Sequence, residues 1–129
     1  GKTRTYVAVD GGLSDNPRPA LEGAKYSIER VAPPPANPTR VVTVSGRHCE
    51  TDRLIAEASL PEDIAPGNLV QVLTTGAYAS SMASNYNRYP RPATVLVRPD
   101  GEFRTVQVRE TFDSMLAREV VPDDLGRER

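Results

Sequence analysis

One short segment of the sequence places several reactive side chains together. His48-Cys49-Glu50-Thr51-Asp52 holds an imidazole, a thiol and two carboxylates within five positions. Neighbouring residues on extended backbone point to opposite sides, and one cysteine with one histidine lacks the paired spacing of zinc motifs, so the segment is a poor metal site. A thiol and a carboxylate that face a ligand pocket are a better interpretation. A polar turn with a small half-buried cysteine fits the same residues.

Arg18 is a second candidate because prolines stand on both sides of it. Pro17 and Pro19 restrict the backbone, which lowers the entropy cost of presenting a guanidinium to a planar anion. A carboxylate suits such an arginine, whose fork makes two parallel hydrogen bonds. The alternative is a surface arginine on a stiff turn.

Aromatic residues mark two further candidates. Gly76-Ala77-Tyr78 opens a predicted helix, which would place Tyr78 beside free backbone amides, where an anion or a ring binds. A tyrosine packed in the core fits equally well. Residues 84–92 interleave tyrosines and arginines as nucleic-acid patches do. We favour a structural loop or a subunit contact for this stretch, because the charge balance elsewhere is not basic.

The bulk composition limits the partners. The chain has 129 residues, and its 16 Lys and Arg against 17 Asp and Glu leave a formal charge of -1. No general field therefore attracts nucleic acid or an anionic membrane. The single cysteine excludes an internal disulfide, and no apolar run approaches the roughly 18 residues of a membrane helix. We expect a cytoplasmic protein without nucleic-acid or membrane partners, and one domain over residues 1–129.

Short strands separated by turns must position these residues. The pattern predicts a mainly β fold, an antiparallel Greek-key-like β-barrel with one or two short helices. Residues 11–23 are expected to form a loop, as are Pro33-Pro34-Pro35 and Pro38. Helices are expected over Gly76–Asn85 and Glu110–Glu119. The predicted strands are Thr5–Val9, Ala24–Val31, Thr39–Val44, Leu54–Ala58, Leu69–Leu73, Thr94–Val97 and Phe103–Val108.

These segments resemble the C-terminal domain of diaminopimelate decarboxylases. Three blocks carry the resemblance: VAVDGGLSDNPRPAL at residues 7–21, GRHCE at residues 46–50, and the stretch from GAY at residues 76–78 to MASNYN at residues 82–87. PRPA at residues 90–93 and RET at residues 109–111 extend it over nearly the whole chain. Two positions depart from the family pattern. Glu22 stands where tyrosine is usual, and the Cys-Glu-Ser-x-Asp loop is one residue shorter, ending at Asp52.

The resemblance implies a fold-type III enzyme in which a (β/α)8 barrel holds pyridoxal phosphate and this domain packs beside it. It also implies a homodimer with shared active sites. Arg18 would bind a substrate carboxylate, Glu50 would contact the distal polar group, and Tyr78 would lie against cofactor and substrate. Cys49 would lie by the reacting carbon, where a thiol that is mostly protonated at neutral pH can donate a proton. Glu22 would bring a negative charge close to the bound substrate carboxylate.

The implied activity is decarboxylation of meso-2,6-diaminopimelate to L-lysine. Because the N-terminus lacks methionine and a signal segment, we interpret the chain as a fragment. It is expected to be inactive alone and to hold no cofactor covalently, because Lys2 lies at the chain end and Lys25 on a polar strand face. An ornithine or arginine decarboxylase is the alternative enzyme. A free-standing β-barrel binding module, for instance for single-stranded nucleic acid, is the alternative from another class.

Overall fold

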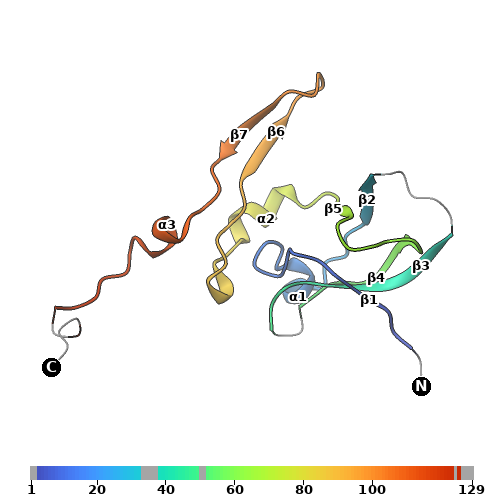
Figure 1. The fold of residues 1–129 in the computed structure, drawn as a ribbon, viewed down its shortest axis with the longest axis horizontal. Helices are drawn as coiled ribbons and strands as arrows, with labels where there is room; N and C mark the ends of the chain where they lie inside the picture. The colour runs from blue at the N-terminus through green and yellow to red at the C-terminus, as the bar shows by residue number, and fades with distance from the viewer. Residues whose placement is uncertain (1–2, 33–37, 50–51, 124, 126–129) are drawn as a thin grey trace. The chain divides into compact units, whose positions relative to one another are not determined.

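The computed structural model describes residues 3–32, 38–49, 52–123 and 125 (Figure 1). The chain divides into two compact units, residues 1–87 and 88–129. The first unit contains β1 (Tyr6–Ala8), α1 (Arg18–Glu22), β2 (Ile28–Ala32), β3 (Thr39–Ser45), β4 (Arg53–Pro61), β5 (Leu69–Val72) and α2 (Gly76–Met82). The 3₁₀ turn η1 (Tyr86–Arg88) lies at the division, and the second unit contains β6 (Thr94–Val97), β7 (Phe103–Gln107) and α3 (Phe112–Leu116). Each of the seven predicted strands overlaps an observed one.

The larger sheet has β3 between β1 and β4. β3 and β4 are antiparallel, with Thr39 opposite Pro61 and Ser45 opposite Arg53. β1 runs parallel to β3, with Tyr6 opposite Thr43. The expectation of an entirely antiparallel sheet is therefore wrong at β1. The chain passes through α1 and β2 before it reaches β3, and a crossover of that length allows parallel pairing.

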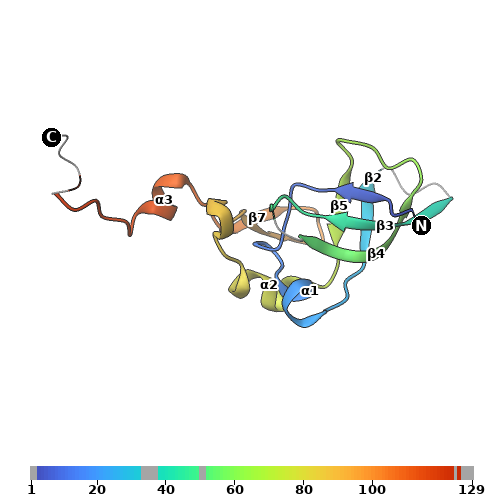
Figure 2. The same cartoon turned by 90° about the horizontal axis from the view of Figure 1, so that it is seen from below.

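A second, two-stranded sheet pairs β2 with β5, and the core lies between the two sheets. Figure 2 shows β1, β3 and β4 side by side with β2 across them. Leu60 and Val44 are fully buried, and Ile28, Val42 and Ala58 complete the core cluster. The period-2 pattern places these side chains inward from both sheets. Hydrogen bonds join the described strands into three separate sheets, so these residues do not form a closed barrel.

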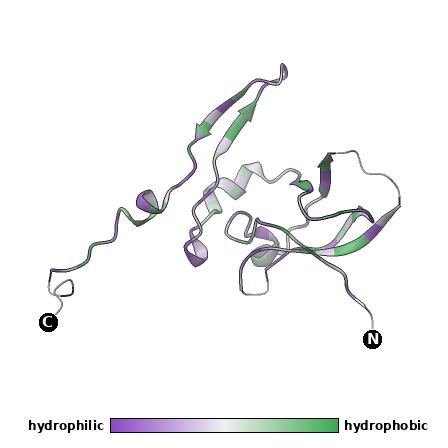
Figure 3. Cartoon of the chain, in the orientation of Figure 1, coloured by the Kyte–Doolittle hydropathy of each residue, from purple (hydrophilic) through white to green (hydrophobic). Residues whose placement is uncertain are grey.

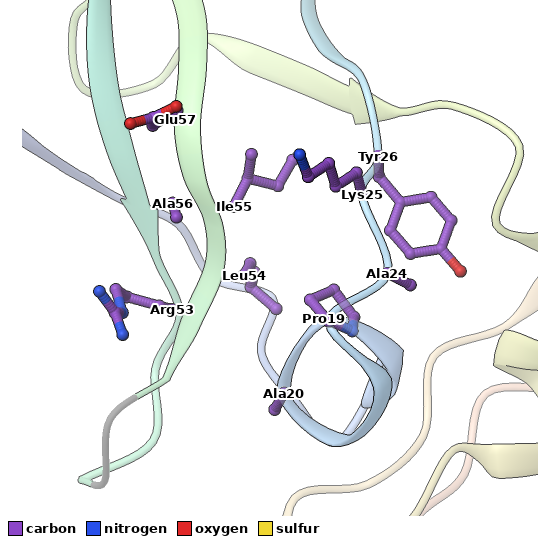
Figure 4. A pocket seen from close by; sticks show the side chains of 11 residues that line it. Pro19, Ala20, Ala24, Lys25, Tyr26, Arg53, Leu54, Ile55, Ala56 and Glu57 are labelled. Atoms are coloured by element: carbon purple, nitrogen blue, oxygen red, sulfur yellow. The ribbon is translucent and has the colours of Figure 1, made fainter.

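The segment between β1 and β2 differs from its prediction in two ways. Residues 11–23 were expected to be loop, but α1 begins at Arg18, because proline is compatible with the first turn of a helix. Gly23, with φ of 66°, adopts the left-handed conformation that ends α1. Residues 24–27 are not part of β2. A cavity of about 700 Å³ separates them from β4, so they lack a strand to pair with (Figure 4).

Both predicted helices are present but shorter than expected. α2 ends at Met82 because Ala83 leaves the helical region of backbone space. α3 begins with a reciprocal cap in which Thr111 and Ser114 each accept the other's backbone N–H. Within the described part of the chain, no helix combines the length and hydrophobicity that crossing a membrane requires.

The second unit is built around the β6–β7 hairpin. Val97 lies opposite Phe103, and Gly101, with φ of 85°, closes the turn between them. Figure 3 shows hydrophobic residues on both strands. Val97 and Phe103 are 64% and 67% exposed, because a two-stranded hairpin has too few neighbours to cover them.

Candidate functional site

Arg18, the first residue of α1, has three close partners. Its Nε donates a hydrogen bond of 2.8 Å to the Glu22 carboxylate, and its Nη1 donates one of 3.2 Å to the Tyr26 hydroxyl. The guanidinium carbon lies 4.8 Å from the centre of the Tyr78 ring, which is within range of a cation–π contact. The structure therefore brings the predicted residues Arg18, Glu22 and Tyr78 together, and it adds Tyr26.

The charge of Arg18 is reinforced by these contacts. The hydrogen bond to Glu22 raises the pKa of the guanidinium, and burial lowers it to a smaller extent. The Arg18 side chain is 29% exposed and the Glu22 side chain 47%, so an incoming anion can reach both. The arrangement presents a permanent cation that an aromatic ring holds in orientation. It is suited to binding a carboxylate.

Tyr26 was not predicted as a site residue, because the pattern of residues 24–31 indicates a strand. The residues of α1 turn the chain back on itself, so that Tyr26 lies near Arg18, eight positions earlier. The signal that was missed is a pair of residues, Pro19 and Gly23. Proline is compatible with the first turn of a helix, and a glycine a few residues later is typical of a helix C-terminus.

The cysteine segment follows the end of β3. Cys49 is exposed, whereas His48 is 6% exposed. The predicted substrate-binding residue Glu50 lies outside the described residues, as does Thr51. Within the described residues, no group of three His, Cys, Asp or Glu side chains is arranged to hold a metal ion.

Asp52 is hydrogen-bonded to this segment and is 4% exposed. Its Oδ1 accepts a hydrogen bond of 2.9 Å from the Leu13 N–H, and its Oδ2 accepts one of 3.0 Å from the His48 N–H. Its main-chain oxygen accepts a bond of 2.7 Å from the Gly46 N–H. One buried carboxylate thus joins the segment before α1 to the segment that bears Cys49.

Ser14 and His48 form a second buried contact between the same segments. The His48 Nε2 lies 2.9 Å from the Ser14 Oγ, and Ser14 is 1% exposed. The Ser14 carbonyl accepts a hydrogen bond of 2.9 Å from the Ser84 N–H. The centres of the His48 and Tyr86 rings are 5.2 Å apart. Asp52, His48 and Ser14 are here called the polar hub, and two of them, Ser14 and His48, also contact the segment that follows α2.

Two glycines allow the two segments to approach each other. A Cβ added to Gly46 would lie 2.7 Å from the Gly12 Cα, and one added to Gly12 would lie 2.7 Å from the Asp52 Oδ2. These distances are too short for real Cβ atoms, so neither position has room for a side chain. Glycine is therefore needed at positions 12 and 46 for close packing.

Comparisons with known proteins agree with one another. The family model described as "Pyridoxal-dependent decarboxylase, C-terminal sheet domain" matches residues 1–76. A diaminopimelate decarboxylase from Actinosynnema pretiosum is 50% identical over 121 residues, which is 93% of this chain and 27% of the relative. One from Mycobacterium tuberculosis is 48% identical over 121 residues, 91% of this chain and 26% of the relative. The chain thus spans about a quarter of these relatives.

A solved structure shows the same arrangement of the backbone. Diaminopimelate decarboxylase from M. jannaschii, crystallised with L-lysine, superposes with a TM-score of 0.84 at 31% sequence identity. The superposition covers 93% of this chain and 27% of that protein.

Proposed function

We propose a function for this chain from one premise: it belongs to the family of C-terminal sheet domains of pyridoxal-dependent decarboxylases. The full-length protein decarboxylates meso-2,6-diaminopimelate to L-lysine, and this chain supplies part of its substrate site. The observation that carries the proposal is the guanidinium of Arg18 held against the Tyr78 ring, in a chain whose relatives bear the name diaminopimelate decarboxylase. The ornithine and arginine alternative has no such support from these names.

Arg18 binds the carboxylate at the end of the substrate that does not react. Its Nη2 is used neither by Glu22 nor by Tyr26, so this atom can donate to a planar anion. Tyr78 restricts the plane of the guanidinium, which lowers the entropy cost of binding. Glu50 contacts the distal polar group in this proposal.

In this proposal Tyr78 lies against the cofactor, and the described residues do not bind it covalently. Pyridoxal phosphate, when bound, supplies the electron sink that decarboxylation needs. It requires a lysine, and Lys25 is the only lysine in the described part of the chain. Figure 4 shows Lys25 pointing into the cavity beside β4 and Tyr26 pointing to the opposite side. Because Tyr26 contacts Arg18, Lys25 points away from the proposed substrate-binding arginine. We therefore place the cofactor lysine and phosphate site in a (β/α)8 domain outside this chain.

Cys49 donates the proton that replaces carbon dioxide. The bond between the carboxylate and the adjacent carbon breaks, carbon dioxide leaves, and that carbon takes the proton of the Cys49 thiol. Water then returns a proton to the thiolate and leaves as hydroxide, which carries the negative charge of the lost carboxylate, so the atoms and charges balance. The exposure of Cys49 in this chain supports the assignment, because a proton donor must reach its substrate.

The remaining parts of the proposal concern assembly. A homodimer with shared active sites would complete the site, and a closed Greek-key barrel would require pairing beyond the strands described. One domain over residues 1–129 and a cytoplasmic setting belong to the same proposal.

Turnover by the full-length protein tests the function. Incubated with pyridoxal phosphate and meso-2,6-diaminopimelate, it should release carbon dioxide and L-lysine in equal amounts. Ornithine and arginine should be turned over at least 100-fold less efficiently, as measured by kcat/KM. Efficient turnover of either one would reject the assignment. The isolated chain should release no carbon dioxide, and a stoichiometric lysine adduct with the cofactor, trapped by borohydride, would contradict its assignment as half of the site.

A further inference from the structure

We propose that Asp52 is a positioning residue, which fixes the segment that leads to Arg18 relative to the segment that carries Cys49. The inference rests on the proposed function, in which Arg18 binds the substrate and Cys49 donates the proton. Asp52 itself touches neither side chain's reacting atoms in this role. It acts through the two backbone segments that it joins.

The Asp52 carboxylate divides its two oxygens between the two segments. Oδ1 accepts from Leu13 and Oδ2 from His48, so each oxygen holds a different segment. The residue is almost entirely buried, and a charged acceptor in such a place makes stronger hydrogen bonds than a neutral one. An asparagine of the same shape has only one acceptor oxygen, and its NH2 group would face the other N–H. Only a carboxylate can serve both segments.

Leu13 and His48, the two residues that Asp52 holds, are each connected to a site residue by a short piece of chain. His48 is directly followed by Cys49. On the other side, the Asp15 and Asn16 N–H groups both donate to the Gly12 carbonyl, and the buried Pro17 then leads into Arg18. A shift at Leu13 or His48 is therefore passed on to Arg18 or Cys49.

The backbone around the Asp52 carboxylate is closely packed. Gly12 and Gly46 have no room for a Cβ, and Asp52 lies against both. The Ser14–His48 contact adds a second connection between the same segments. Because misplacement of catalytic groups by about 1 Å can cost about 100-fold in rate, this packing bears directly on catalysis.

The test is Asp52→Asn in the full-length enzyme, compared with Asp100→Asn. Asp100 is a matched control, because its Oδ1 also accepts a backbone N–H, from Glu102 at 3.0 Å, but in an exposed turn of the second unit. With active sites counted by bound cofactor, Asp52→Asn should raise KM for meso-2,6-diaminopimelate at least fivefold and lower kcat at least tenfold. Asp100→Asn should change neither more than twofold.

A stability control separates positioning from simple loss of folded protein. Val42→Ala removes buried volume from the core, and Val42 has no part in the polar hub. It should lower the melting temperature while KM stays unchanged, because unfolding removes active sites without altering those that remain. If Asp52→Asn lowers the melting temperature but leaves KM within twofold of wild type, the positioning role is rejected.

Amide hydrogen exchange distinguishes a failure of this inference from a failure of the proposed function. In Asp52→Asn the amide that faces the new NH2 group, that of Leu13 or that of His48, should exchange at least tenfold faster, whereas the β4 amides should keep their rates. If the wild-type enzyme does not decarboxylate diaminopimelate, the proposed function is rejected, and faster exchange at either amide still supports the connection that Asp52 makes between the two segments. Unchanged exchange at both amides overturns that connection whatever the activity.

Discussion

The Nε atom of Arg18 donates a hydrogen bond of 2.8 Å to the carboxylate of Glu22, one helical turn further along α1. A substrate carboxylate that binds Arg18 must therefore share the guanidinium with a carboxylate of the protein. Exposed pairs of this kind are weak, so the substrate can compete. The like charge of Glu22 remains close by after the substrate has bound.

Glu22→Gln in the full-length enzyme should lower KM for diaminopimelate about threefold to tenfold, because the repulsion between two carboxylates is removed. The turnover number should change little, since Glu22 is assigned no proton transfer. Steady-state kinetics at low ionic strength measures both constants. Glu29→Gln, an exposed carboxylate bound to Gln71, is the control and should leave KM unchanged. A KM that rises in Glu22→Gln would mean that Glu22 helps to bind the substrate.

Arg18→Lys keeps the positive charge but loses the planar fork and its stacking on Tyr78. KM for diaminopimelate should rise at least tenfold, because two parallel hydrogen bonds become one. The comparison is with Arg98→Lys, an exposed arginine of the second unit that pairs with Glu102. Equal KM values for the two variants would show that Arg18 is not the carboxylate-binding residue.

Cys49→Ala removes the proposed proton donor and should lower kcat about 100-fold or more, within the range of general acid catalysis. The amount of cofactor bound, measured by absorbance, should not change, because Cys49 is assigned no contact that holds it. Cys49→Ser places a hydroxyl where the thiol was, and its kcat should lie between that of the wild type and that of Cys49→Ala. A variant with full turnover would reject Cys49 as the acid.

Leu60→Ala should destabilise the first unit by about 2–5 kcal/mol, because Leu60 is fully buried between the sheets and its removal leaves a cavity. Val41→Ala, one residue before the buried Val42 and 69% exposed, should cost less than about 0.5 kcal/mol. Hydrogen exchange of the β3 amides in the full-length protein reports both values. Equal effects would show that Val41 is covered in the assembled enzyme.

The strands could be predicted from sequence because alternation of apolar residues is a local property. Val42, Val44 and Leu60 face the core as the pattern indicates. How the strands pair depends on long-range contacts, and no local pattern distinguishes the parallel β1–β3 pair from an antiparallel one. The same limit applies to the predicted barrel, because its closure depends on pairing between strands that are distant in the sequence.

The site was predictable where residue types alone define chemistry, as with Arg18 and Tyr78, which lie together. Asp52 was recognised only as part of a reactive segment. Of its two partners, Leu13 is distant from Asp52 in the sequence and His48 is close to it. Both partners donate a backbone N–H, which almost every residue has. A role that depends on backbone donors leaves no signature in residue types.

The parallel pairing of β1 with β3 has a consequence for the order of folding. β3 and β4 are neighbours in the sequence and close a short loop, whereas Tyr6 meets Thr43 only after the whole intervening chain has been drawn in. Closing a long loop costs more entropy before any contact repays it. In a refolding experiment followed by pulse labelling, the β3–β4 hairpin should be protected first and β1 should dock late.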